Sequence, residues 1–222
     1  MVESFDILTF DCYGTLIDWE TGIITAFQSE AARVCAELDG GQIIAAYSTE
    51  EAAVESGPYR SYREVLAETA SRVAAGLGWE LSPDRTGFLA ASLPLWKPFQ
   101  DTNSALERLA SRFKLGILSN IDDDLLAATR KHFTVDFDLV VTAQQVKSYK
   151  PGIAHFQEAM ARASGKRVLH AAQSYFHDVL PACELGIPVV WVNRKCSSAQ
   201  PGGPLPTHEV RDLSQLADLL GA

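Results

Sequence analysis

The stretch from Ile7 to Leu16, Ile-Leu-Thr-Phe-Asp-Cys-Tyr-Gly-Thr-Leu, is the part of the chain that decides the fold. An apolar run ends at a single carboxylate, Asp11, and a glycine-containing turn follows at once. A buried strand that ends in this way places an acid at the carboxyl edge of a sheet, where open α/β sheets bind ligands. Tyr13 stands two positions after Asp11, where a second acid could lie.

Short apolar runs and helical patterns alternate after residue 94. The runs at 114–118, 137–142, 168–172 and 188–193 predict strands, and helical patterns lie between them and at 213–219. Strands that alternate with helices form parallel sheets with right-handed crossovers. The sequence therefore predicts an α/β fold in which helices flank a parallel sheet.

Only helical patterns occupy the segment between the first strand and residue 94. Apolar residues recur at helical spacing over 21–38, and 43–55 and 62–77 also look helical. We expect Gly40 and Gly41 to end the first of these helices. This block is interpreted as an inserted all-helical cap. The expected domains are a core of 1–17 and 95–222 and a cap of 18–94.

The composition is that of an ordinary globular protein, with 222 residues, 47% of them hydrophobic and 21% charged. No apolar run approaches the roughly 18 residues that span a bilayer, and the first six residues show no signal peptide, so we expect a cytoplasmic protein without a membrane partner. The four cysteines form no C-x-x-C pair, which favours reduced thiols over a zinc site or a disulfide framework.

The net charge of −9 and the lack of any run of Lys or Arg argue against a nucleic-acid partner. The expected partner is a small anionic substrate, which requires local positive charge because the overall field repels it. A homodimer is among the assemblies that the sequence allows.

Polar residues follow four of the predicted strands. They are Asp11, Tyr13 and Thr15 after the first strand, Ser119 and Asn120 after the second, Lys150 in the loop after the third, and Gln173, Tyr175 and Asp178 after the fourth. The carboxyl ends of parallel strands lie along one edge of a sheet, so these residues are expected to converge.

This set resembles the haloacid dehalogenase (HAD) superfamily. The matching motifs are Asp-x-Tyr-Gly-Thr-Leu at 11–16, Leu-Ser-Asn at 118–120, Lys-Pro at 150–151, and Asp178 followed by a helix and Val-Trp-Val-Asn-Arg at 190–194. The resemblance implies a Rossmann-like core with a cap inserted after the first strand. It also implies that Asp11 is a nucleophile that forms an ester, which water then hydrolyses.

The resemblance assigns roles to the other candidate catalytic residues as well. Lys150 would hold Asp11 ionised and attract an anion, Ser119 and Asn120 would donate hydrogen bonds to the substrate, and Asp178 would orient the lysine or the hydrolytic water. Structural roles remain open for all of them. Asp11 can be a turn residue, Ser119 and Asn120 can cap a helix, Lys150 can be solvated, and Asp178 can favour a helix dipole.

Two positions separate the branches of the superfamily. The phosphatase branch carries a second aspartate two residues after the nucleophile, and it binds Mg²⁺ through an acid at the start of the fourth motif. Here these positions are Tyr13, a poor base near neutrality, and Gln173, which is uncharged. The pattern resembles the second-type 2-haloacid dehalogenases better. Those enzymes convert a 2-haloalkanoic acid to a 2-hydroxy acid, and we expect no metal or other cofactor.

Substrate recognition is less well matched. The dehalogenases present an arginine from an early cap helix, but no arginine lies between Arg33 and Arg60 here. Arg60 can supply the charge from another turn, or it can form an exposed ion pair. The candidate substrate contacts are Cys12, Tyr13, Thr15, Asn120, Arg60, Gln173 and Tyr175.

Two histidines and two other functions also stay open. His170 is expected to be a satisfied core residue of a buried strand, and His177 is a candidate base. A Mg²⁺-dependent phosphatase with an atypical site and a non-catalytic HAD scaffold are the alternatives to the dehalogenase.

Overall fold

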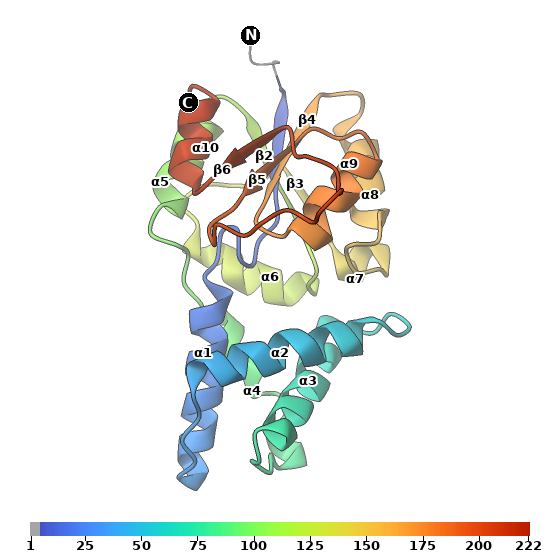
Figure 1. The fold of residues 1–222 in the computed structure, drawn as a ribbon. Coiled ribbons are helices and arrows are strands. Elements are labelled where there is room, and N and C mark those ends of the chain that lie inside the picture. Colours follow the sequence, from blue (N-terminus) through green and yellow to red (C-terminus); the bar gives the residue numbers. More distant parts are fainter. Residues whose placement is uncertain (1–4) are drawn as a thin grey trace. The chain divides into compact units, whose positions relative to one another are not determined.

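A computed structural model describes residues 5–222 of the protein (Figure 1). Residues 1–4, part of the N-terminal stretch searched for a signal peptide, lie outside the described residues. The chain divides into two compact units. Of the described residues, the first unit contains 5–17, 98–120 and 131–222, and the second contains 18–97 and 121–130. No helix within 5–222 has both the length and the apolar character needed to cross a membrane.

The first unit is built on a parallel sheet of six strands in the order β3-β2-β1-β4-β5-β6. The strands are β1 (Ile7–Phe10), β2 (Lys114–Ser119), β3 (Leu139–Thr142), β4 (Val168–Ala172), β5 (Val189–Val192) and β6 (His208–Val210). All residues of β1, β4 and β5 are buried, as expected for strands covered on both faces. The predicted α/β fold with a parallel sheet is confirmed.

Helices cover both faces of this sheet. In Figure 1, α5 and α10 lie together on one side of the sheet, and α8 and α9 lie on the other. One apolar cluster under α8 and α9 contains Phe156, Val179 and Trp191, which fixes these helices against β2, β3 and β5. The helices of this unit are α5 (Thr102–Ala110), α7 (Ala143–Val146), α8 (Ala154–Ala163), α9 (Leu180–Glu184) and α10 (Leu213–Leu219).

The strand register places the polar loop residues side by side. Phe10 pairs with Ile117 of β2 on one side and with Ala171 of β4 on the other. The chain therefore leaves β1, β2 and β4 at nearly the same level of the sheet. The loops that begin with Asp11, Asn120 and Gln173 consequently start beside one another.

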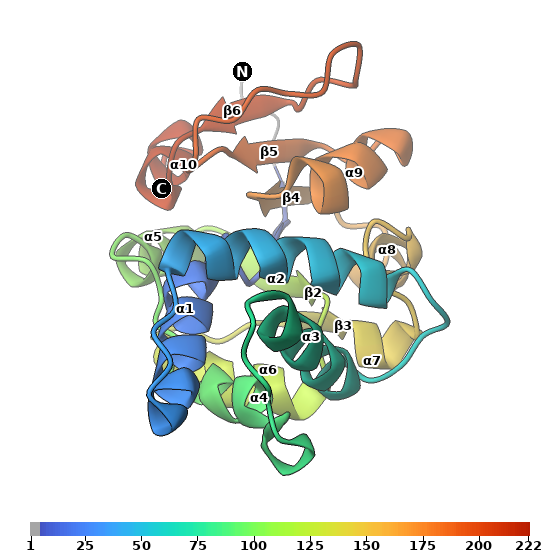
Figure 2. The ribbon, with the colours of Figure 1, turned by 60° about the horizontal axis from the view of Figure 1, so that its bottom comes forward.

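The second unit is helical, as expected for the inserted segment. Figure 2 shows α2 and α3 side by side, with α1 against α2. The α3 helix begins with a capping box, in which Ser61 and Glu64 satisfy each other's backbone N–H groups. The helices of this unit are α1 (Trp19–Ala31), α2 (Gly40–Glu55), α3 (Tyr62–Gly76), α4 (Phe88–Ser92) and α6 (Asp123–Thr129).

Several predicted boundaries differ from the structure. Gly40 and Gly41 do not end the first helix, because α1 ends at Ala31 and a short 3₁₀ turn follows it. Both glycines lie in the first turn of α2, whose N-cap, Asp39, accepts a hydrogen bond from the Gln42 N–H. The structure groups 95–97 and 121–130 with the helical unit, whereas the predicted division at 17/18 and 94/95 placed both in the core.

Candidate active site

Asp11 follows β1 directly, and two side chains hold its carboxylate. Oδ1 accepts a hydrogen bond from the Lys150 ammonium at 2.9 Å, and Oδ2 accepts one from the Thr15 hydroxyl at 3.0 Å. The backbone N–H of Asp11 donates to the Ala171 carbonyl of β4. Asp11 is 8% exposed, so the carboxylate is largely buried but still accessible. These contacts fix one carboxylate at the edge of the sheet.

Lys150 is the centre of the site. Its ammonium donates to Asp11 Oδ1, to Asp178 Oδ1 at 2.6 Å and to the Leu118 carbonyl at 2.9 Å. An ammonium has three N–H donors, so these three acceptors use all of them. The side chain is 1% exposed. Lys150 is therefore a fixed cation between two carboxylates and not a solvated surface residue.

Asn120 holds the main chain of Lys150 from both ends of its amide. Asn120 Oδ1 accepts the Lys150 N–H at 2.7 Å, and Asn120 Nδ2 donates to the Lys150 carbonyl at 3.0 Å. Asn120 was predicted to contact the substrate, but its amide binds the main chain of Lys150 instead. This pair of hydrogen bonds sets where the Lys150 side chain begins.

Asp178 lies in a π-helical turn, Tyr175–Val179, that follows β4. Its side chain is fully buried, and Oδ1 accepts hydrogen bonds from Lys150 and from His170 Nε2 at 3.1 Å. Asp178 Oδ2 is buried and has no hydrogen-bond partner within the described residues. π-helical turns occur frequently at functional sites.

Ser119 ends β2 and contributes a second buried atom of the same kind. Its side chain is 1% exposed, and Oγ has no partner within residues 5–222. Its backbone carbonyl accepts a hydrogen bond from His155 Nε2 at 3.2 Å. Buried polar atoms are nearly always hydrogen-bonded, if not to protein then to water or ligand. Ser119 Oγ and Asp178 Oδ2 are thus available for atoms that the protein does not supply.

Burial disfavours the charged form of Asp11, Asp178 and Lys150, whereas the attraction between the lysine and the two carboxylates favours it. Burial is the main cause that raises the pKa of Asp11, with a contribution from the charge of Asp178, while Lys150 acts against the rise. Burial also disfavours the charged forms of Asp178 and Lys150, but their mutual attraction prevails. It holds the pKa of Asp178 well below its ordinary value and that of Lys150 well above. At neutral pH Asp178 is therefore a carboxylate and Lys150 an ammonium.

Two of the predicted substrate contacts stabilise the loop after β1. Thr15 Oγ1 donates to Asp11 and accepts the Gln173 N–H at 2.9 Å, which ties this loop to the one after β4. The Gln173 carbonyl accepts a hydrogen bond from the indole N–H of Trp191 at 2.8 Å. Thr15 and the main chain of Gln173 therefore hold the loop that carries Asp11 in place.

Within residues 5–222, neither the Tyr175 hydroxyl nor the Cys12 thiol forms a hydrogen bond with the Asp11 carboxylate. The Tyr175 hydroxyl donates to the Pro204 carbonyl at 2.6 Å, and the ring packs edge-on against Trp191. Cys12 is fully buried, and burial holds the pKa of its thiol well above the ordinary value. A buried neutral thiol is neither a nucleophile nor a surface for substrate.

Arg60 and Tyr13 remain predicted substrate contacts. Arg60 belongs to the helical unit, where its Nη1 lies 2.6 Å from Glu68 Oε2, so it takes part in the ion pair that was its structural alternative. Tyr13 is half-buried in the loop directly after Asp11.

Sequence reasoning missed two residues that contact this group. His170 is buried and hydrogen-bonded, as expected for a satisfied core residue, and the sequence did not show that one of its partners is Asp178. Arg194 donates from Nη2 to the Thr15 carbonyl at 2.9 Å and forms a bidentate pair with Asp101. Arg194 belongs to the Val-Trp-Val-Asn-Arg motif, and its position after the last strand of that motif could have indicated a place near the other strand ends.

The donor set fits a divalent cation poorly. Asp178 Oδ1 is occupied by Lys150 and His170, and Gln173 stands where a carboxylate ligand is expected. Within residues 5–222 no three His, Cys, Asp or Glu side chains are grouped so as to hold a metal ion. Hard cations such as Mg²⁺ prefer carboxylate and carbonyl oxygens.

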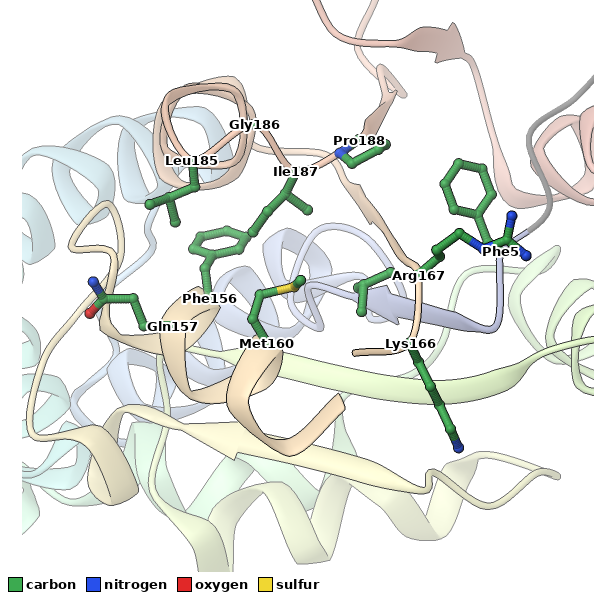
Figure 3. Close-up of a pocket in the computed structure, with 11 residues that line it drawn as sticks. Phe5, Phe156, Gln157, Met160, Lys166, Arg167, Leu185, Gly186, Ile187 and Pro188 are labelled. Carbon is green, nitrogen blue, oxygen red and sulfur yellow. The ribbon is translucent and has the colours of Figure 1, made fainter. Parts of the chain in front are cut away.

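A separate cavity lies near the opposite ends of the strands. Its volume is about 550 Å³, and its walls are mainly apolar side chains such as Phe156, Met160 and Ile187 (Figure 3). Lys166 and Arg167 lie at its border, just before β4 begins. None of the candidate site residues lines it.

Comparison with known proteins gives one matching family model and relatives along the whole chain. The model, described as haloacid dehalogenase-like hydrolase, matches residues 5–171. The chain is 28% identical over 233 residues to (S)-2-haloacid dehalogenase H-109 of Pseudomonas putida, covering 99% of each. It is also 31% identical over 138 residues to a glyceraldehyde 3-phosphate phosphatase of Methanothermobacter thermautotrophicus, covering 57% of this chain and 60% of the relative.

A solved structure has the same fold. The L-2-haloacid dehalogenase from Xanthobacter autotrophicus with chloropropionic acid covalently bound superimposes with a TM-score of 0.85. The match covers 99% of both chains at 20% sequence identity. At that identity the likeness concerns the fold alone.

Proposed function

Because the chain belongs to the haloacid dehalogenase-like hydrolase family, we propose that it hydrolyses the carbon–halogen bond of a small 2-haloalkanoic acid. The product is the corresponding 2-hydroxy acid, and the intermediate is an ester on Asp11. The observation that carries the proposal is the placement of Asp11 against the fixed ammonium of Lys150, with Tyr13 and not an acid two residues later. No metal takes part in the proposed reaction.

In the first step a carboxylate oxygen of Asp11 attacks C2 of the substrate. A carbon–oxygen bond forms, the carbon–halogen bond breaks, and halide leaves with the electron pair. Halide is a weak base and needs no proton, which is why an acid at the position of Tyr13 is unnecessary. The ammonium of Lys150 holds Asp11 in place and offsets the charge of an anionic substrate.

In the second step water attacks the carbonyl carbon of the aspartyl ester. The bond between that carbon and the ester oxygen breaks, the 2-hydroxy acid leaves, and Asp11 returns as a carboxylate with one oxygen from water. The unpartnered Oδ2 of Asp178 is an acceptor for a hydrogen of that water, and Ser119 Oγ is a donor for a substrate carboxylate or for the ester carbonyl. The proton released goes to solvent.

The decisive test combines product and label. Chloroacetate, fluoroacetate and 2-chloropropionate are incubated with the protein in the absence of added metal, and halide release is measured. A single turnover in H₂¹⁸O is then followed by mass spectrometry of the peptide that contains Asp11, and we expect ¹⁸O in that carboxylate. Asp11→Asn serves as the control. The proposal fails if no small haloacid yields halide and Asp11→Asn behaves like the parent protein.

A Mg²⁺-dependent phosphatase is the second candidate, and one observation favours it, namely the partial similarity to a phosphatase. Hydrolysis of p-nitrophenyl phosphate that rises with Mg²⁺ and disappears with EDTA would support it. The variant Tyr13→Asp supplies the acid that a phosphate ester needs for its leaving alkoxide, so a gain of rate in this variant alone identifies the missing group.

The location and the partners are part of the same proposal. Reduced cysteines suit the cytoplasm, and all four are free in the structure. The proposed ligand is a small organic anion and not a nucleic acid or a membrane. A non-catalytic scaffold becomes the better account if no substrate turns over while such an anion still raises the melting temperature.

A further inference from the structure

His170 lies on β4, directly behind the candidate active site, and is fully buried. Its Nε2 is 3.1 Å from Asp178 Oδ1, and its Nδ1 is 3.0 Å from the Thr9 hydroxyl oxygen on β1. The ring packs edge-on against Phe156 of α8, with 5.1 Å between ring centroids. Each edge of the imidazole therefore has a defined neighbour.

The chemistry of the Asp178 carboxylate fixes the direction of its hydrogen bond with the ring. An ionised carboxylate only accepts, so His170 Nε2 carries the hydrogen and donates to Asp178. The Thr9 hydroxyl lies 3.0 Å from Nδ1 and 3.4 Å from the Leu169 carbonyl, so Nδ1 faces a group that can both donate and accept. Thr9, His170, Asp178, Lys150 and Asp11 thus form one continuous chain of hydrogen bonds from the middle of the sheet to the nucleophile.

The two donors of Asp178 converge on the same oxygen. Lys150 and His170 both donate to Oδ1, which leaves Oδ2 without a protein partner. A carboxyl group held only by Lys150 could rotate and offer either oxygen to the ammonium. The second donor comes from a different direction and a rigid strand, so it selects one orientation.

We propose that His170 is a positioning residue that holds Asp178 with Oδ2 free for the hydrolytic water. This inference rests on the proposed function, since it concerns the second step of that reaction. His170 touches neither substrate nor Asp11 and acts through Asp178. Its loss is therefore expected to slow hydrolysis of the ester more than formation of the ester.

The charged and titratable groups around the imidazole are consistent with this role. Asp178 on the π-helical turn faces Nε2, and Lys150 and Asp11 follow it in the chain of hydrogen bonds. His155 of α8 also lies nearby, and burial together with the charge of Lys150 lowers its pKa to about 3, so it adds no charge near neutrality. The hydrogen bond from His170 is one of the contacts that hold the pKa of Asp178 low.

Two variants separate the hydrogen bond from the ring packing. His170→Phe keeps an aromatic ring against Phe156 but donates nothing to Asp178, whereas His170→Gln places an amide N–H near the former Nε2. Phe156→Leu is the packing control, because it removes the ring contact and leaves both hydrogen bonds of His170 intact. Folding of each variant is checked by its thermal transition.

The measurements are steady-state halide release and the mass of the Asp11 peptide during turnover. We expect kcat of His170→Phe to fall about 10- to 100-fold, the range for loss of a hydrogen bond to a buried charge, with KM little changed. The peptide should then carry the mass increment of the unhydrolysed ester. His170→Gln should recover most of the rate, and Phe156→Leu should accumulate no ester.

The opposite results overturn the proposal. If His170→Phe turns over like the parent, or slows without accumulating ester while Phe156→Leu slows equally, His170 serves packing only. An inactive parent refutes the proposed function instead, and the position of the proton then decides the inference. In ¹⁵N spectra of histidine-labelled protein, His170 must carry its proton on Nε2 near neutral pH, and Asp178→Asn must shift that resonance. A ring without a proton on Nε2 would falsify the assigned hydrogen bond.

Discussion

Asn120 and Lys150 hold each other by two hydrogen bonds, of 2.7 Å to the Lys150 N–H and 3.0 Å from the Asn120 amide to the Lys150 carbonyl. The two residues are 30 positions apart and come from the loops after β2 and β3. An amide that bridges the N–H and the carbonyl of one residue fixes that residue's main chain in both position and orientation. The fixed main chain places the Lys150 ammonium within hydrogen-bonding distance of Asp11 and Asp178.

The first prediction concerns this pair. Asn120→Ala removes both hydrogen bonds and is expected to lower the free energy of unfolding by about 1–3 kcal/mol. The freed loop should also displace the ammonium, so kcat/KM for halide release should fall more than tenfold. Asn120→Asp keeps the acceptor but not the donor, so its stability and its kcat/KM should lie between those of Asn120→Ala and the parent. Equal activity of Asn120→Ala and the parent would show that Lys150 needs no such support.

The second prediction concerns the buried charges. Lys150→Met leaves Asp11 and Asp178 facing each other without a cation, and breaking a buried pair in this way costs about 3–5 kcal/mol. The double variant Lys150→Met with Asp178→Asn removes one of the uncompensated charges. It should regain part of the stability but none of the activity. Urea denaturation at neutral pH measures the difference, and a double variant no more stable than Lys150→Met contradicts the expectation.

The third prediction is the pH dependence of kcat/KM. Asp11 must be ionised to attack, and burial raises its pKa above the ordinary 3.8, so the acid limb should lie above that value. Activity is then present above the limb and lost as the pH falls through it. Lys150 must stay protonated, and its two carboxylate partners raise its pKa above the ordinary 10.5. Deprotonation of Lys150 should therefore cause no loss of kcat/KM below pH 10.5. An alkaline loss of kcat/KM below that pH would contradict the assignment if the variant Lys150→Arg shifted it to another pH.

Asp178 gives the same experiment a second readout. Its pKa lies below the ordinary 3.8 in the folded protein, so it stabilises the fold fully above that pH and progressively less as the pH falls toward the folded value. Stability measured against pH should consequently decline on the acid side in the parent. Asp178→Asn should show a smaller decline, since it has no carboxyl group to protonate.

The sequence predicted the framework of the site because strand ends have a strong local signal. The strand at 168–172 and the helix at 213–219 have the predicted bounds, and Asp11, Lys150 and Asp178 meet through the register of parallel strands. The alternation of strands and helices predicts parallel strands, and the carboxyl ends of parallel strands lie along one edge of the sheet.

The sequence could not predict the hydrogen-bond partners of individual side chains. An asparagine at a strand end has the same local pattern whether its amide faces a substrate or the main chain of Lys150. His170 likewise has apolar neighbours in the sequence of its strand. Its partner Asp178 comes within hydrogen-bonding distance only because the π-helical turn folds back toward the strand. Gly40 and Gly41 misled because the N-cap Asp39 begins a new helix at the point where the glycines suggest an end.

The last prediction tests the packing of the helical unit. A Cβ added at Gly22 of α1 would lie 2.4 Å from Cγ of the Trp96 indole, which is only 4% exposed. Gly22→Ala should therefore destabilise the protein by about 1–3 kcal/mol, the usual cost of overpacking, despite the higher helix propensity of alanine. Gly76→Ala is the matched control, because Gly76 ends α3 with no atom within 4 Å of the added Cβ. It should be neutral or stabilising by up to about 1 kcal/mol. Thermal unfolding of both variants decides the matter, and a Gly22→Ala protein as stable as Gly76→Ala would mean that the indole does not rest on α1.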